Sequence, residues 1–497
     1  MKRFDKTWSR IAQMGWDERR TRAAQEINKR VDLILYRAGV PSHGNGLSKA
    51  NPSRGNFFFS QTELPDLLSL FKQKMSAEVD GIVREADDIC RHRFHLLGYE
   101  DLDYGAEIDW HMDAVHGKRA PSKAWFKIDF LDFDEAGDHK VIWELNRHQH
   151  LVTLAKAWCL TSDQRYKTEL QSQWYSWQRA NPYPIGINWA SSLEVGFRSL
   201  SWLWVLALLP EQAVEPDFRR DVTRALAIHG RHIERNLSTY FSPNTHLLGE
   251  AVALFFIAIM CPEIAVAERW RKNGWRMLIE EAQRQVRADG VYFEQSLYYH
   301  VYALDFFLHA RILAARNGIE IPAEFDAVLN KMLDVLAAVS AAGCAEGFGD
   351  DDGGRVFNPR RNGSEHMTDP LALGAILFQR EELKSAGSLT EEAVWLFGRP
   401  GVSCFDAAAD DARKVEASSF AEGGIYLMAG GMEAPLQMVI DAGPQGTGRS
   451  GHGHADALGV SVAMAGRQWL VDPGTYCYMC GERDGFRGTG AHNTLLV

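Results

Sequence analysis

The sequence predicts a multidomain α+β fold, in which a helical toroid is followed by an antiparallel β-sandwich. Its 497 residues are too many for one ordinary compact domain. Apolar residues recur at helical spacing up to about residue 400, and short glycine-rich runs with strand character follow. A hydrophobic fraction of 46% provides enough apolar material for both cores.

The helical part contains three clear runs, at residues 193–209, 247–260 and 302–315. Turn signals such as Asn181-Pro-Tyr-Pro separate helices of modest length. Such a succession indicates hairpins stacked around an axis, and a toroid is the closed form of that arrangement.

Strand-like runs follow at residues 424–429, 437–442, 458–465 and 469–471. In the third run, large apolar residues from Leu458 to Met464 alternate with small ones, which is the period of a strand with one buried face. These runs predict one side of a sandwich. Because the last residues again resemble a strand, we expect an incomplete sandwich. The expected domains are a helical extension (1–90), the toroid (91–400) and the sandwich (401–497).

The net charge of −11 argues against a protein that binds nucleic acid or a membrane surface. An acidic partner would therefore need a local basic groove. No run is apolar enough to span a bilayer, and the first 30 residues lack the hydrophobic core of a signal peptide. We expect a cytoplasmic protein, or a periplasmic one if a leader is missing. The single Cys-x-x-Cys pair at Cys477 and Cys480 is weak evidence for a metal.

Histidines and an aspartate near the C-terminus suit a zinc site. His454 lies in Gly-His-Gly-His-Ala-Asp, Asp472 in Val-Asp-Pro-Gly, and His492 in Ala-His-Asn. Neutral imidazoles and a carboxylate are zinc ligands, and these three converge if their strands are neighbours. The fourth ligand stays open, and a pair of surface histidines is the alternative interpretation.

Two helix starts carry polar groups. Ser242 or Asn244 can cap a helix on which His246 and Glu250 share a face, so that the carboxylate can orient the imidazole. Residues 289–302 form a tyrosine-rich helix start, and a tyrosine near a cation can act as general acid or base. An ordinary capped helix and aromatic packing are the alternatives. Three further polar clusters lie at residues 143–150, 188–198 and 348–355.

The order of these motifs resembles the heparinase II/III family of polysaccharide lyases, from about Tyr104 to the C-terminus. The resemblance rests on Trp-Glu-Leu-Asn-Arg-His, Asn-x-His-x-x-x-Glu, Glu-x-Ser with Tyr-His, Gly-Asp-x-Asp-Gly-Gly-Arg, His-x-His-x-Asp, Val-Asp-Pro-Gly and Ala-His-Asn. It implies an incomplete (α/α) toroid followed by antiparallel sheets, with the active site between them. It also implies β-elimination at a uronic acid of an acidic polysaccharide, without an organic cofactor.

The resemblance assigns roles to residues. It implies that Asn244 and His246 neutralise the uronate carboxylate, although Thr245 stands where many relatives have a second asparagine. Tyr299 matches the catalytic tyrosine, with Tyr298 as the neighbouring candidate, and His452 matches a histidine offered by the β-domain. The implied ligands of a structural zinc are His454, Asp472 and His492. The implied substrate-binding residues are Asn188, Glu194, Arg198, Glu250, Arg355 and Arg449.

Two other functions stay open. A glycoside hydrolase on a similar toroid needs two carboxyl groups about 5 to 9.5 Å apart, which Glu194, Glu250 and residues 350–352 can supply. A glycan-binding protein of the same fold without turnover is the other alternative. The polysaccharide and the oligomeric state are not specified: heparan-type glycans, other glycosaminoglycans, alginate-like polymers and bacterial exopolysaccharides all fit.

Overall fold

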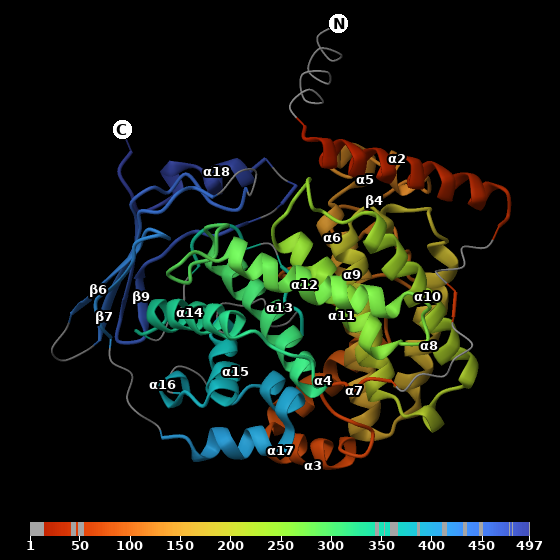
Figure 1. The fold of residues 1–497 in the computed structure, drawn as a ribbon, viewed down its shortest axis with the longest axis horizontal. Coiled ribbons are helices and arrows are strands. Elements are labelled where there is room, and N and C mark those ends of the chain that lie inside the picture. The colour runs from red at the N-terminus through yellow and green to blue at the C-terminus, as the bar shows by residue number, and fades with distance from the viewer. Residues whose placement is uncertain are drawn as a thin grey trace, which may run out of the picture.

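The computed structural model consists of a large helical part, which includes two short hairpins, and one five-stranded antiparallel sheet, which lies at the left in Figure 1. It describes residues 14–40, 46–47, 54–342, 347–351, 353–357, 366–384, 388–409, 415–430, 435–446, 451–476, 478–479 and 481–496. No helix among these residues has the length and hydropathy needed to cross a bilayer.

The helices follow one another with short connections. They are α2 (Trp16–Arg37), α3 (Leu64–Lys74), α4 (Ser76–Ile89), α5 (Phe133–Ala136), α6 (His139–Asn146), α7 (Gln149–Thr161), α8 (Gln164–Ala180), α9 (Ser192–Leu208), α10 (Pro216–Arg235), α11 (Thr245–Met260), α12 (Ala267–Gln285), α13 (Leu297–Arg316), α14 (Ala323–Val339), α15 (Asp369–Phe378), α16 (Glu381–Lys384) and α17 (Glu391–Ala407). Two short hairpins, β1 (Arg93–Leu96) with β2 (Tyr99–Asp103) and β3 (Met112–Asp113) with β4 (Lys118–Arg119), lie between α4 and α5. The three helical runs expected from the sequence correspond to α9, α11 and α13, with bounds shifted by up to five residues.

Contacts between helices run around a ring. The helices α7, α9, α11, α13, α15 and α17 contact one another in that order, and α3 contacts both α17 and α7. The helices α8, α10, α12, α14 and α16 each contact the ring helix that precedes them. This arrangement confirms the predicted toroid of helical hairpins.

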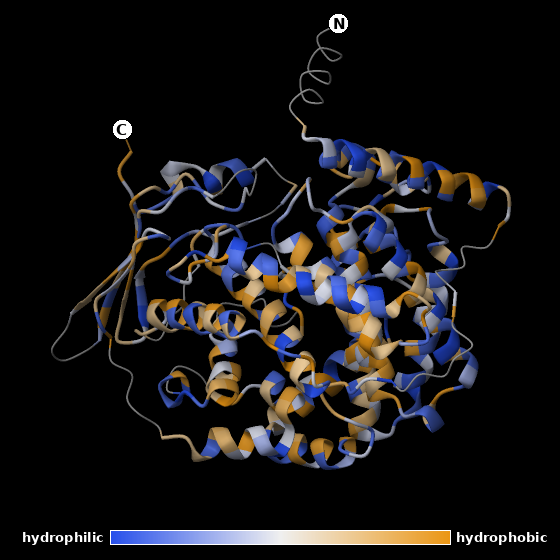
Figure 2. Ribbon diagram, viewed as in Figure 1, coloured by the Kyte–Doolittle hydropathy of each residue, from blue (hydrophilic) through white to orange (hydrophobic). Residues whose placement is uncertain are grey.

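The ring helices α9 and α11 are buried on all sides, which explains their composition. Every residue of α9 is buried, and α11 is buried from Leu247 to Ile259. The peripheral helices α8, α10 and α12 alternate buried and exposed residues. In Figure 2 the outer helices mix hydrophilic and hydrophobic residues. A helix that is apolar all around belongs in a core, whereas an amphipathic helix covers one.

The sheet has the strand order β5-β6-β7-β8-β9, and all its pairs are antiparallel. The strands are β5 (Ser418–Phe420), β6 (Ile425–Gly430), β7 (Leu436–Asp441), β8 (Gly459–Met464) and β9 (Arg467–Leu470), followed by the short helix α18 (Arg483–Arg487). Each of the four runs expected to be strands overlaps a strand, so the predicted sheet is confirmed. In the described residues it forms a single layer.

The face of the sheet that packs on the helices is not the one the alternation in β8 suggested. Ile425 and Leu427 of β6 are buried, and Gln437 of β7 donates to Ala338 O at the end of α14 (2.7 Å). Through the register, Ser461 and Ala463 of β8 share this inner face, whereas the larger Val460, Val462 and Met464 lie on the other. Close approach to the toroid favours the small side chains.

Candidate active site between the toroid and the sheet

A cleft of about 680 Å³ lies where the ring helices meet the loops of the β-part. Asn244, His246 and Tyr299 line it from the toroid, and His452 lines it from the β-part. The structure therefore brings together the four residues to which the motif resemblance assigned catalytic roles. A second hollow, of about 700 Å³, contains none of them.

Asn244 is the N-cap of α11, and its side-chain oxygen accepts a hydrogen bond from the His246 backbone N–H (3.2 Å). The cap fixes both residues at the positive end of a helix, where backbone N–H groups favour a bound anion. Thr245 is fully buried, and its hydroxyl bonds Glu294 and Tyr292. Of the two candidates at this turn, Thr245 therefore belongs to the support beneath the cleft.

Glu294 is a buried hub that the sequence reasoning did not single out. Its carboxylate accepts hydrogen bonds from Asn244 Nδ2 (2.8 Å) and the Thr245 backbone N–H (3.1 Å). It also lies 3.4 Å from His452 Nε2. One carboxylate thus fixes the start of α11 and contacts the histidine contributed by the β-part.

Tyr299 and His452 are in direct contact in the cleft. Their rings are stacked, with centroids 3.8 Å apart and an interplanar angle of 20°. The neighbouring Tyr298 is 2% exposed and does not line the cleft, and burial raises the pKa of its hydroxyl well above the ordinary value. The cleft therefore receives the tyrosine that the motif matched and not its neighbour.

Asp350 is a second hub, and it holds the β-part loops. Its buried carboxylate accepts from His452 Nδ1 (3.1 Å), His454 Nε2 (2.9 Å) and Arg483 (2.9 Å). Burial alone raises the pKa of Asp350, but the bonds from the two histidines outweigh it, so the pKa lies below its usual range. The backbone N–H of Asp350 also donates to His452 O (2.8 Å).

The three expected metal ligands do converge. One ligand atom from each of His454, Asp472 and His492 lies within 4.8 Å of the others. The bond from His454 Nε2 to Asp350 leaves Nδ1 of that ring buried and without a hydrogen-bond partner in the part of the chain that the structure describes. A carboxylate on one ring nitrogen and a bare second nitrogen is the arrangement of metal-binding histidines.

The lining is basic although the chain is acidic. Among the described lining residues, six are arginine or lysine and one is acidic: Arg22, Lys29, Lys140, Arg147, Arg483 and Arg487 against Glu194. Arg147 binds Glu194 through two bonds of 2.6 and 3.0 Å, and it also binds Glu144 (2.7 Å). Burial raises the pKa of Glu194, but the charge of Arg147 outweighs it and lowers the pKa. The cleft is the local basic groove that an acidic partner requires.

Four residues expected to bind substrate lie elsewhere. Asn188 donates to Trp110 O (3.0 Å), and Arg198 donates to the backbone of Asn188 (3.1 Å); both are fully buried. Burial lowers the pKa of Arg198 to about 9. Arg355 pairs with Asp305 (2.7 Å) beneath the surface. These groups connect helices of the toroid and do not line the cleft.

Glu250 is the fourth expected substrate-binding residue that does not line the cleft. It accepts from the backbone N–H (2.7 Å) and hydroxyl (2.6 Å) of Ser238, and burial raises its pKa to about 8. It thus positions a loop at the cleft edge. Arg449, Cys477 and Cys480 lie outside the described residues.

Several residues of the site were not assigned a role in the lyase interpretation of the sequence. Glu294, Asp350 and Arg147 lie inside motifs that the sequence does display, but their charge alone does not distinguish a buried hub from a solvated side chain. The signal available was their place in those motifs: Arg147 in Trp-Glu-Leu-Asn-Arg-His, Glu294 in Glu-x-Ser and Asp350 in Gly-Asp-x-Asp-Gly-Gly-Arg.

Two family models match the chain. Residues 54–345 match the model "Heparinase II/III N-terminus", and residues 412–497 match "Heparinase II/III-like, C-terminal". Together they cover the ring helices from α3 to α14 and the whole sheet.

Curated relatives and solved structures agree with these matches. The chain is 26% identical over 442 residues to a heparin-sulfate lyase of Pedobacter heparinus, covering 84% of this chain and 58% of that protein. It is 24% identical to one of Bacteroides stercoris, covering 83% and 59%. The crystal structure of heparan sulfate lyase HepC from Pedobacter heparinus aligns with a TM-score of 0.53 at 23% identity, covering 87% and 65%. A crystal structure of heparinase III aligns with a TM-score of 0.60 at 19% identity, covering 89% and 70%. The chain thus spans less than two thirds of the length of the two curated relatives.

Proposed function

Because the chain belongs to the heparinase II/III family, we propose that it is a polysaccharide lyase that cleaves a uronate-containing glycan by β-elimination. The observation that carries this proposal is the stacked pair of Tyr299 and His452 in a basic cleft, beside the capped start of α11. The names of the relatives make heparan-type glycosaminoglycans the first substrates to test.

The reaction requires stabilisation of negative charge. When the C5 proton of the uronic acid leaves, electron density moves into the adjacent carboxylate. Donors aimed at that group lower the barrier because they are already in place when the charge develops. Asn244 and His246, at the N-terminus of α11, can supply such donors, and Glu294 holds Asn244 in position.

Tyr299 and His452 are suited to the proton transfers. In our proposal Tyr299 protonates the leaving oxygen at C4, and Tyr299 or His452 removes the C5 proton. The C4–O bond breaks and a C4–C5 double bond forms, so no water is consumed and no electron acceptor is needed. Asp350 and Glu294 fix the imidazole against the tyrosine ring.

The carboxylates of the cleft argue against hydrolysis. A glycosidase needs two carboxyl groups on opposite sides of a sugar, one of them with a raised pKa. Among the described residues Glu194 is the sole carboxylate in the lining, and Arg147 neutralises it and lowers its pKa. Glu250 does not line the cleft and accepts hydrogen bonds from Ser238 at its edge. Asp350 is fully buried and is bound to His452 and His454.

Product chemistry tests the proposal directly. Incubation of the wild-type chain with a panel of uronate polymers should release oligosaccharides with the ultraviolet absorbance of a conjugated uronate. New reducing ends without that absorbance would instead indicate a hydrolase. Binding without either product would favour the non-catalytic glycan-binding protein.

We further propose that His454, Asp472 and His492 hold a structural zinc ion. Two imidazoles and a carboxylate suit zinc, and the bare Nδ1 of His454 fits a ligand. When bound, the ion would hold together the segments that carry these three residues. Because His454 is only two residues from His452, the ion would also help to position His452. It would not contact the sugar in this scheme.

The zinc proposal predicts that metal removal destabilises the chain. A ligand present at a hundredfold its dissociation constant stabilises the folded state by about 2.7 kcal/mol. We therefore expect chelation to lower the unfolding midpoint, and zinc to restore it. Elemental analysis should find about one zinc per chain, and His454→Ala should lose it. Purified protein without zinc, and with a melting curve unaffected by chelator, would exclude the site.

A further inference from the structure

Helix α2 forms one wall of the cleft, although it precedes residue 54, where the family match begins. Its residues Arg22, Gln25 and Lys29 line the cleft, and their spacing places them on one helix face. In Figure 1, α2 crosses the edge of the toroid as an outer helix. The cleft is therefore bounded on this side by a segment outside the matched part of the chain.

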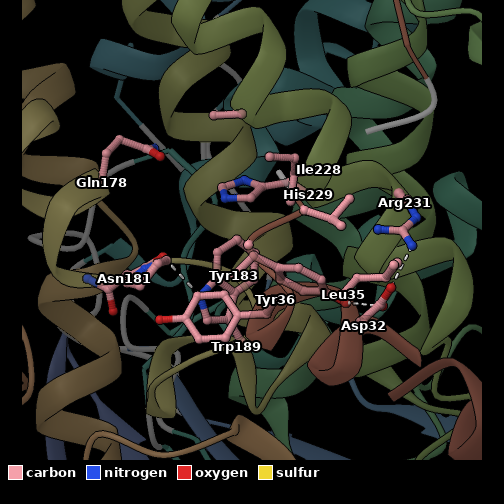
Figure 3. Close-up of a pocket in the computed structure, with 14 residues that line it drawn as sticks. Asp32, Leu35, Tyr36, Gln178, Asn181, Tyr183, Trp189, Ile228, His229 and Arg231 are labelled. Carbon is pink, nitrogen blue, oxygen red and sulfur yellow. Dashed lines mark hydrogen bonds and ion pairs between the residues drawn. The ribbon is translucent and has the colours of Figure 1, made fainter. Parts of the chain in front are cut away.

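Polar bonds hold α2 in place. Arg22 donates to Tyr240 O (3.1 Å) and Gln25 to Leu237 O (3.2 Å), both in the loop that leads to Asn244. One turn beyond Lys29, the buried carboxylate of Asp32 pairs with Arg231 of α10 (2.6 Å) and accepts from the Tyr183 hydroxyl (2.8 Å). Figure 3 shows Asp32 and Arg231 meeting at the rim of the second hollow. These bonds fix the position of the helix along the cleft.

The orientation of α2 is the reverse of that of an ordinary surface helix. A helix that only covers a protein turns its apolar face inward. Here Ile27 and Ile34 are 62% and 64% exposed, whereas the face carrying Arg22, Lys29 and Asp32 is directed at the protein. In Figure 2, the second half of α2 is mainly orange, which marks hydrophobic residues. Packing energy does not explain this orientation, but a polar wall for the cleft does.

The face of α2 that lines the cleft offers an acidic sugar a cation, Lys29, beside an aromatic ring, Trp125. The Lys29 ammonium lies 5.1 Å from the centre of the Trp125 ring, which also lines the cleft. Lys29 pairs with Glu26 (2.8 Å), which is mostly exposed, and such surface pairs contribute little. The ammonium can therefore exchange that partner for a sulfate or carboxylate at small cost, while the indole packs against a sugar ring.

We propose that α2 builds a specificity-determining subsite, in which Lys29 and Arg22 bind an acidic group of a sugar unit remote from the cleaved bond and Trp125 packs against its ring. This proposal rests on the cleft being a glycan-binding site, as in the proposed function. It predicts dependence on chain length, because an oligosaccharide that occupies only the Tyr299 end leaves the α2 subsite empty.

The test compares Lys29→Gln with Arg30→Gln. Arg30 is exposed on the same helix and does not line the cleft, so the control removes the same charge from the outer surface. Binding of size-defined heparan oligosaccharides to the full chain is measured by calorimetry, and KM and kcat are measured from unsaturated product. A charge-assisted hydrogen bond of typical strength predicts about tenfold weaker binding and about tenfold higher KM for Lys29→Gln with octasaccharides.

We expect kcat to stay within about twofold, tetrasaccharide binding to be unchanged, and Lys29→Arg to restore most of the loss. Equal losses at all lengths, equal losses in Arg30→Gln, or no binding of octasaccharides by the wild type would overturn the subsite. The binding measured by calorimetry does not depend on cleavage of the oligosaccharide. Length-dependent binding without unsaturated product would therefore support the subsite while rejecting the lyase.

Discussion

Tyr299→Phe should reduce the formation of unsaturated product by about 10²- to 10⁴-fold, with most of the loss in kcat. The substitution removes the hydroxyl that, in the proposed mechanism, donates the proton to the leaving oxygen. It preserves the ring that stacks on His452, and the side chain is only 5% exposed, so the packing should remain. Initial rates on a heparan-type polymer measure the loss. The unfolding midpoint and oligosaccharide binding should stay close to wild type.

Tyr298→Phe is the matched control, because it removes a hydroxyl one residue away on the same helix. Tyr298 is buried and does not line the cleft, so its variant should keep most of its turnover per folded molecule. If Tyr298→Phe loses activity and Tyr299→Phe retains it, the assignment of the acid is wrong by one residue. If neither variant differs from an active wild type, tyrosine catalysis fails while elimination itself stands.

The sequence predicted those features that depend on local patterns. The runs that became α9, α11 and α13 are apolar on all sides because these are ring helices, and the alternation after residue 424 matched the strands of the sheet. Motif order was sufficient to select Asn244, His246, Tyr299 and His452, which the cleft brings together. The convergence of the three proposed zinc ligands was also foreseen.

What the sequence could not show depends on packing between distant segments. Arg198 and Arg355 carry the charge expected of a subsite, but the ring buries them and their partners are Asn188 O and Asp305. The face of β8 was misjudged because size and alternation do not say which face meets the toroid. The wall formed by α2 has no local signature, because its polar residues look solvated until the helix is placed against the cleft.

Asp350→Asn should have the second large effect, because this carboxylate joins the toroid loop to three cationic or imidazole groups of the β-part. Its oxygens accept from His452, His454 and Arg483, and it is fully buried. An asparagine keeps one acceptor oxygen and places an amide donor against another donor. Removing one partner of a buried ionic network typically costs about 3–5 kcal/mol. Loss of the carboxylate behind a metal-binding histidine typically costs about 10- to 100-fold in metal affinity or activity.

We therefore expect Asp350→Asn to lower the free energy of unfolding, the zinc content and the rate of product formation together. Asp484→Asn is the control, since it makes the same chemical change at an exposed position of α18. Denaturant unfolding, elemental analysis and initial rates measure the three quantities. Joint loss distinguishes Asp350 from Tyr299, whose substitution should affect turnover alone. If Asp350→Asn matches Asp484→Asn in all three, then His452 and His454 are held by other contacts, and the two halves of the site are coupled through Glu294 instead.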